Sequence, residues 1–129
     1  MATTDLGLVR ERSSGTVTAV LQDEAAVVIP GASLSTLTLR LYDIATGTIL
    51  NSRAGALDVG GQNVLNTNNV TVDAGGILTW SVQAADHAVV STNPRARERH
   101  RAVFEFTWGS GKRDWHALEF LVEAEPGVT

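Results

Sequence analysis

The sequence predicts an all-β protein, a single antiparallel β-sandwich of about seven to eight strands. Two observations lead to this fold class. Apolar residues recur at every second position in several segments, which is the period of a strand with one buried face. Turns rich in glycine separate these segments, and no long stretch has the period of an amphipathic helix. A length of 129 residues suits one domain with one hydrophobic core.

The chain divides into three parts. Residues 1–15 are polar and end in Ser13-Ser14-Gly15, so we expect a flexible N-terminal arm that lacks regular structure. Such an arm is either a frayed end or a strap that docks on a neighbouring subunit. Residues 16–124 form the sandwich, and residues 125–129 form a C-terminal tail. The strands with the clearest alternation lie within residues 16–22, 36–42, 78–83, 101–108 and 117–123.

The connections between the strands are less regular. Residues 54–69 have no clear pattern and contain several Gly and Asn residues, so we expect a long loop or an edge excursion. A single helical turn is predicted around Asp86, whose carboxylate can accept hydrogen bonds from nearby backbone N–H groups. The last two strands form a hairpin centred on Ser110, which sets Phe106 opposite Asp114. This register places four apolar side chains on one buried face, namely Phe104, Phe106, Leu118 and Phe120.

The composition argues against several classes of function. A formal net charge of −4 and an isoelectric point near 5.2 disfavour non-specific binding to nucleic acid, which needs a basic surface. The absence of Cys excludes disulfides, thiolate metal sites and cysteine nucleophiles. The first residues show no signal-peptide pattern, and no apolar stretch approaches the ~20 residues of a membrane span. We therefore expect a protein that is made in the cytoplasm and does not bind a membrane.

No motif in the sequence predicts catalysis, a cofactor or a metal. His100 and His116 share a face of the predicted hairpin but lie ~13 Å apart, which is too far for one ion. The sequence contains neither a Gly-x-Ser-x-Gly elbow nor a phosphate-binding glycine loop. We therefore do not expect an enzyme. A small hydrolase ranks third, after the two non-enzymatic functions described at the end of this section. One group of oxygen-bearing side chains consists either of loop residues or of calcium ligands: Asn66, Asn68, Asn69 and Asp73.

An arginine-rich segment is the first candidate for a protein contact. Arg95, Arg97, Arg99 and Arg101 occupy alternate positions, so an extended backbone projects all four from one face. Such a stripe either prevents aggregation at a strand edge or binds the carboxylates or phosphates of a partner.

Apolar side chains on the outward face of the strands are the second candidate. Trp115 and Leu121 lie on the hairpin face opposite Phe120, and Tyr42 and Val103 also point away from the predicted core. An apolar outer face is either covered by another strand or loop, or it makes a contact between subunits.

Three segments in succession carry a resemblance to a known group of proteins. They are residues 37–43 with the turn at 45–47, residues 73–80 with the turn at 85–86, and the hairpin of residues 101–123. Their order resembles the small immunoglobulin-like domains of tailed-bacteriophage virion proteins, including the N-terminal domains of siphophage baseplate upper proteins. The chain departs from antibody-type domains because it lacks their Cys pair, and it carries one domain where baseplate upper proteins have more.

The resemblance implies a non-enzymatic virion protein with an immunoglobulin-like sandwich. Its expected role is that of an adaptor or decoration subunit at the neck, tail, baseplate or capsid surface. Its expected partners are copies of itself, in a symmetric homo-oligomer, and other virion proteins, with no cofactor. The alternative is an adhesion module that binds carbohydrate or another surface ligand through an exposed Trp115 or Trp108.

Overall fold

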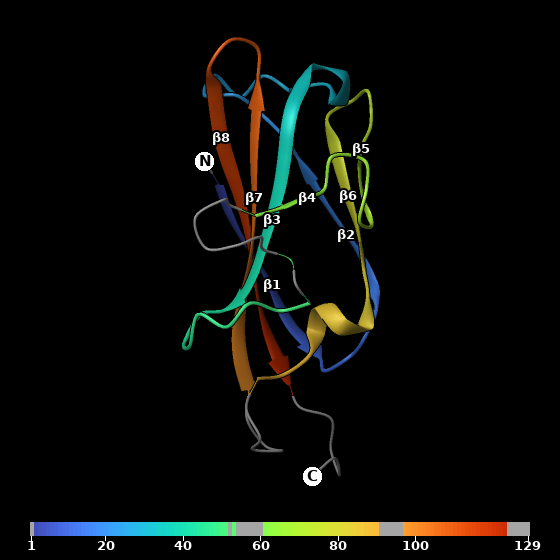
Figure 1. Ribbon diagram of the computed structural model, residues 1–129, viewed down its shortest axis with the longest axis vertical. Coiled ribbons are helices and arrows are strands. Elements are labelled where there is room, and N and C mark those ends of the chain that lie inside the picture. The colour runs from blue at the N-terminus through green and yellow to red at the C-terminus, as the bar shows by residue number, and fades with distance from the viewer. Residues whose placement is uncertain (1, 52, 54–60, 91–96, 124–129) are drawn as a thin grey trace.

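The chain folds into two β-sheets that lie face to face, as the computed structural model shows for residues 2–51, 53, 61–90 and 97–123 (Figure 1). The first sheet has five strands in the order β1-β8-β7-β3-β4. They are β1 (Ala2–Arg10), β8 (Lys112–Glu123), β7 (Arg97–Trp108), β3 (Leu34–Asp43) and β4 (Gln62–Asn63). The second sheet has three strands in the order β2-β6-β5, which are β2 (Gly15–Val20), β6 (Ile77–Val82) and β5 (Val70–Val72).

The strand order is that of an immunoglobulin-like sandwich. The chain crosses repeatedly between the two sheets. In the first sheet β7 pairs with both β3 and β8, and in the second sheet β2 pairs with β6. All pairs are antiparallel except β1 with β8, which is parallel. The predicted all-β sandwich is therefore confirmed, with eight strands in the described part of the chain. Two short 3-10 turns accompany them, η1 (Gly31–Ser33) and η2 (Ala84–His87).

The register of the last hairpin is also confirmed. Phe106 of β7 lies opposite Asp114 of β8, as the centre at Ser110 requires. Gly109 and Gly111 flank that centre with φ angles of +58° and +78°, which glycine adopts more readily than other residues. The turn therefore fixes which side chains of both long strands face the core.

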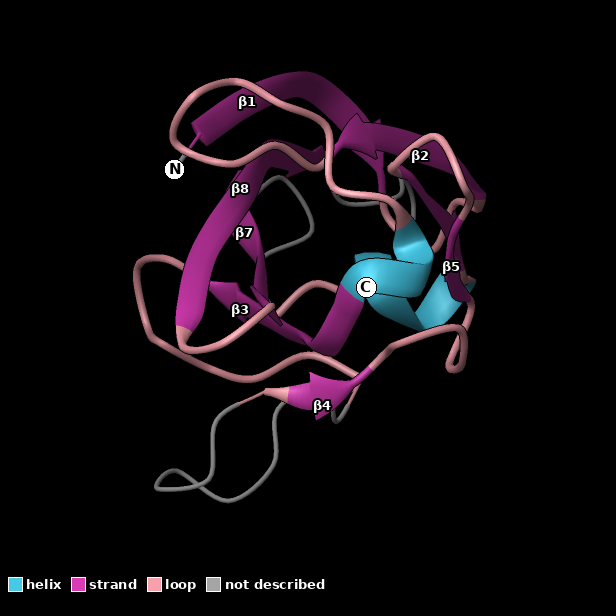
Figure 2. Ribbon diagram, turned by 90° about the horizontal axis from the view of Figure 1, so that it is seen from above, coloured by secondary structure: helices cyan, strands magenta, loops and turns pink. Residues whose placement is uncertain are grey.

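The N-terminal segment differs from the sequence prediction. Residues 1–15 were expected to lack regular structure, whereas residues 2–10 form β1 and pair with β8 along the edge of the larger sheet (Figure 2). Side chains 3–8 are exposed, and the only apolar alternation within them, Leu6 and Leu8, is too short to predict a strand. Backbone hydrogen bonds hold β1 to β8 instead, and a pattern of hydrophobic side chains cannot predict them. The predicted tail at 125–129 lies outside the described residues.

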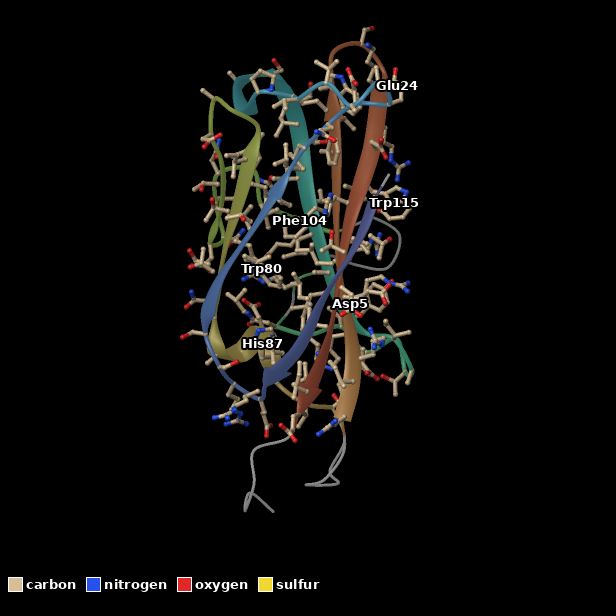
Figure 3. The ribbon with its side chains drawn as sticks, turned by 180° about the vertical axis from the view of Figure 1, so that it is seen from behind. Asp5, Glu24, Trp80, His87, Phe104 and Trp115 are labelled. Atoms are coloured by element: carbon tan, nitrogen blue, oxygen red, sulfur yellow. The ribbon has the colours of Figure 1, made fainter. Side chains whose placement is uncertain are left out.

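Large apolar side chains from both sheets fill the space between them. Trp80 of β6 meets Phe104 of β7 edge to face, with ring centroids 5.8 Å apart (Figure 3). Phe120 of β8 lies 6.5 Å from the Trp80 ring. Leu39 and Leu118 are also buried in this cluster. These contacts are the sandwich core that the alternating pattern predicted.

The region predicted as a long loop, residues 54–69, is described from residue 61 onward. Residues 62–63 form the two-residue strand β4, which pairs with Thr38 and Leu39 of β3. Gly61 makes this approach feasible, because a Cβ atom there would lie 2.7 Å from the carbonyl oxygen of Leu39. In the described part of the chain, no helix is both long enough and apolar enough to cross a membrane.

Candidate functional site

The outward face of the five-stranded sheet contains a shallow hollow, here called the outer hollow. Val103 of β7 and Ala117 of β8 are paired across the strands and both line it. Tyr42 of β3 and Trp115 of β8 line it on either side. Its volume is about 470 Å³. The predicted apolar outer face is therefore present, and Tyr42 and Trp115 come together on it although they are far apart in the sequence.

Positively and negatively charged residues, joined in ion pairs, surround the outer hollow. Arg101 donates from Nε to Oε2 of Glu119 at 3.1 Å, and its Nη2 lies 3.0 Å from the same oxygen. Arg113 pairs with Glu105 through Nη2 and Oε2 at 2.6 Å. Each pair joins β7 to β8, so positive and negative groups alternate around an apolar centre.

Tyr42 is held in place by Arg101, its cross-strand partner on β7. The Nη1 group of Arg101 donates a hydrogen bond to the Tyr42 hydroxyl at 3.1 Å, and the guanidinium carbon lies 5.9 Å from the ring centre. The hydrogen bond to Tyr42, together with Glu119, raises the pKa of Arg101 although burial opposes the charge. The Tyr42 ring therefore stands beside a cation that stays charged.

The arginine stripe is paired within the molecule. Arg97 binds Glu123 at 3.2 Å, and Arg99 lies 3.6 Å from Asp5 and 3.8 Å from Glu119. Arg97, Arg99 and Arg101 do share the outward face as predicted, whereas Arg95 lies outside the described residues. Exposed pairs of this kind contribute little to stability, so a partner can exchange them at low cost.

Two apolar candidates occupy other positions. Leu121 lies between its cross-strand partners Leu8 and Arg99, half-buried, and does not line the outer hollow. Trp108 is buried and packs beside Phe106 at 5.6 Å, so the expectation of an exposed Trp108 is wrong. Trp108 is the last residue of β7 and continues its inward-facing series, which the alternation of this strand could have indicated.

A buried ion pair near η2 was not predicted. Arg53 donates from Nε and Nη2 to the two carboxylate oxygens of Asp86, at 2.9 and 3.0 Å. Asn51 and the backbone N–H of Gln83 also donate to this carboxylate. The expectation that Asp86 binds nearby backbone is therefore confirmed, whereas Arg53 lies in a segment without a pattern that could have indicated it.

These contacts determine the charge state of Asp86. Burial raises the pKa of its carboxyl group, but the hydrogen bonds from Arg53, Asn51 and Gln83 and the attraction of the Arg53 guanidinium outweigh that effect. The net result is a pKa below the usual value of an aspartate. The group therefore stays ionised inside the protein, where it joins η2 to the segment that follows β3.

The oxygen-rich group considered for calcium holds turns together. Asn66 accepts the backbone N–H of Val72 at 3.0 Å, and Asp73 accepts those of Gly75 and Ile77 at 2.8 and 3.0 Å. The backbones of Asn66, Asn68 and Asn69 adopt positive φ angles of 54°, 52° and 72°. Such conformations and hydrogen bonds are typical of asparagine and aspartate in tight turns.

Comparison with known proteins identifies no family for this chain. No family model matches the sequence, and no curated protein matches it. Among solved structures, the chain is similar to the N-terminal Ig1-2 module of the Drosophila receptor protein tyrosine phosphatase DLAR, with 9% identity and a TM-score of 0.39. The match covers 98% of this chain and 48% of that one, so the chain spans about half the length of that structure.

Proposed function

We propose that this protein is a non-enzymatic assembly subunit that binds a second copy of itself through the outer hollow. The observation that carries the proposal is the cluster of half-buried Tyr42, Val103 and Trp115 around the buried Ala117 on the outward face of the larger sheet. Aromatic rings around an apolar centre, with charges at the rim, are typical of protein contact surfaces.

The charges around the hollow favour a second copy as the occupant. In a two-fold contact the same surface patch lies on both sides, so a self-complementary patch needs both signs of charge. The outer hollow has both, because Arg101 and Arg113 alternate with Glu105 and Glu119. Rotation of one copy about a two-fold axis can set the arginines of each copy against the glutamates of the other.

The wider setting that we propose is a tailed-bacteriophage virion. The order of the strand segments and their turns supports it through the resemblance described above. In such a particle the subunit would act as an adaptor or decoration at the neck, tail, baseplate or capsid surface, with other virion proteins as further partners. Weak contacts repeated around a ring would give tight assembly. Genes for portal, terminase or tail proteins next to this gene would support the setting, and neighbours of unrelated function would count against it.

The contact is tested by replacing single residues and measuring molar mass by light scattering after size exclusion. We expect Trp115→Glu to reduce the mass to the 13.7 kDa of one chain, because a carboxylate at the wall of the hollow must be desolvated on contact. The matched control is Ile77→Glu, which changes an apolar side chain that is 40% exposed on the other sheet. Equal effects of the two variants would contradict the assignment of the contact to the outer hollow.

Carbohydrate binding is the second candidate, because Trp115 is half-buried at the wall of an open hollow. Sugars stack on such rings, so a ligand would change the Trp115 fluorescence and protect the chain against unfolding. A panel of oligosaccharides that changes the fluorescence of the unmodified chain, but not that of Trp115→Phe, would favour this candidate over self-association.

A further inference from the structure

We propose that Asp43, Glu98 and His100 bind one divalent transition-metal ion, with Zn²⁺ as the ion that this donor set suits. The site lies inside the sandwich, away from the outer hollow, where the end of β3 meets the start of β7. Asp43 and His100 are directly paired across these strands, and Glu98 is the preceding inward-facing residue of β7.

The geometry brings three metal-binding atoms around one point. Nε2 of His100 lies 2.9 Å from Oε1 of Glu98 and 3.8 Å from Oδ1 of Asp43. Two atoms that each bind an ion at about 2.0–2.2 Å are separated by roughly 2.8–4.4 Å. The three ligand atoms together lie within 4.8 Å of one another, whereas a tetrahedral ion places its ligand atoms roughly 3.3–3.6 Å apart, so a shared ion requires the most distant pair to approach by about 1 Å.

Because the three side chains are buried, a cation at this point would offset the repulsion between the two carboxylates. His100 is fully buried, and Asp43 and Glu98 are 3% and 8% exposed. Two carboxylates so close together in an apolar interior repel each other, and one Nε2–H group can donate a full hydrogen bond to one of them. A divalent ion takes the place of this proton at Nε2, so the neutral imidazole carries its proton on the buried Nδ1. The ion and the two carboxylates then have no net charge left over, which removes the repulsion.

Neighbouring groups already orient the two carboxylates. Thr46 donates to Oδ2 of Asp43 from its backbone N–H at 3.1 Å and from its hydroxyl at 2.7 Å. The backbone N–H of Val90 donates to Oε1 of Glu98 at 2.8 Å, the same oxygen that faces His100. Metal-binding carboxylates are commonly held by such second contacts, which set the direction of the oxygen that binds the ion.

A cavity reaches the two carboxylates and gives room for solvent ligands, while the fully buried His100 is not part of its lining. The cavity has a volume of about 440 Å³ and is lined by Asp43, Thr46, Val90 and Glu98, among others. Arg97 and Arg99 also line it, but their side chains belong to the opposite face of β7 and pair with Glu123, Asp5 and Glu119. Their positive charge is therefore largely offset outside the site.

The donor types select the class of metal. One imidazole nitrogen and two carboxylate oxygens suit Zn²⁺, which takes both kinds of ligand and accepts water at a remaining position. Calcium and magnesium prefer oxygen ligands throughout, so the imidazole disfavours them. Binding would join the end of β3 to the start of β7 and make this end of the larger sheet more rigid.

The experiment titrates Zn²⁺ into the full chain after chelator treatment, by calorimetry and by thermal unfolding. We expect one ion per chain and a rise in Tm of at least about 5 °C when free Zn²⁺ is about 100 times Kd. Asp43→Asn, which keeps the shape and an acceptor for Thr46, should weaken binding at least tenfold. The matched control His116→Gln removes a histidine of β8 that lies outside the cluster and should leave the affinity unchanged.

A second measurement guards against loss of folding in the variants. Co²⁺ added to the unmodified chain should give the visible absorption bands of an ion with a nitrogen and oxygen ligand set, and Zn²⁺ should abolish them. If the unmodified, folded chain shows neither binding heat, nor a Tm shift, nor Co²⁺ bands, the three residues form a hydrogen-bonded cluster without a metal. An equal loss of affinity in His116→Gln would likewise overturn the proposal.

Discussion

At the scale of single residues, the ion pair between Arg53 and Asp86 is the clearest case of a buried charge that is fully compensated. The guanidinium also donates to Gln62 and to the carbonyl of Asn68, so its nitrogens bind three different segments. Both side chains are almost completely buried. A buried pair contributes little compared with apolar residues of the same shape, but loss of one partner is costly because the other charge remains in the interior.

We expect Asp86→Asn to lower the free energy of unfolding by about 3–5 kcal/mol, because it leaves the Arg53 guanidinium without its counter-charge. The control is Asp5→Asn, which breaks an exposed pair with Arg99 and should cost less than about 1 kcal/mol. Urea unfolding followed by circular dichroism measures both values. Similar losses in the two variants would show that burial does not determine the strength of these pairs.

The lowered pKa of Asp86 also predicts a dependence of stability on pH. The folded state holds this carboxyl ionised at pH values where the unfolded chain already binds a proton. Its contribution is therefore complete above the pKa of about 3.9 in the unfolded chain and is lost as the pH falls toward the folded-state pKa. Below about pH 4, the unmodified chain should lose stability more steeply than Asp86→Asn, by up to about 1.4 kcal/mol per pH unit. Parallel curves for the two proteins would contradict this.

At the scale of elements, the sequence predicted the strands that have one buried and one exposed face. Leu37, Leu39 and Leu41 mark β3 in this way, and the glycines around Ser110 define the hairpin of β7 and β8. β1 could not be predicted because its side chains 3–8 are exposed and its pairing relies on the backbone. The longer strands with one face on the core were therefore predicted, whereas the three-residue β5 was not, although its Val70 and Val72 are buried.

The turn before β6 provides a test at this scale. Gly76 has a φ of +73°, and a Cβ atom there would collide with Cγ1 of Val28 and lie 2.7 Å from the carbonyl oxygen of Ile29. Gly111 has a similar φ of +78° but no atom near its Cβ position. We expect Gly111→Ala to cost about 1–2 kcal/mol from backbone conformation alone, and Gly76→Ala to cost about 1–3 kcal/mol more. Equal losses on urea unfolding would contradict the close contact between the two loops.

At the scale of the whole molecule, the proposed contact lies on the outward face of the larger sheet. Alternation along the strands predicted that Tyr42, Trp115 and Leu121 share this face, and the structure confirms it. The rim charges could not be assigned in advance, because the partner of Arg99 or Arg101 depends on side chains of neighbouring strands. The buried groups were equally hidden, since Arg53 and Asp86 are 33 positions apart and lie outside the strands.

Self-association is tested most directly by sedimentation equilibrium of the unmodified chain over about a thousandfold range of concentration. If copies bind through the outer hollow, the average mass rises with concentration from 13.7 kDa toward a multiple of that value. The rise should weaken at high salt, because the rim of the contact is charged. A mass that stays at 13.7 kDa at every concentration would contradict the proposed contact.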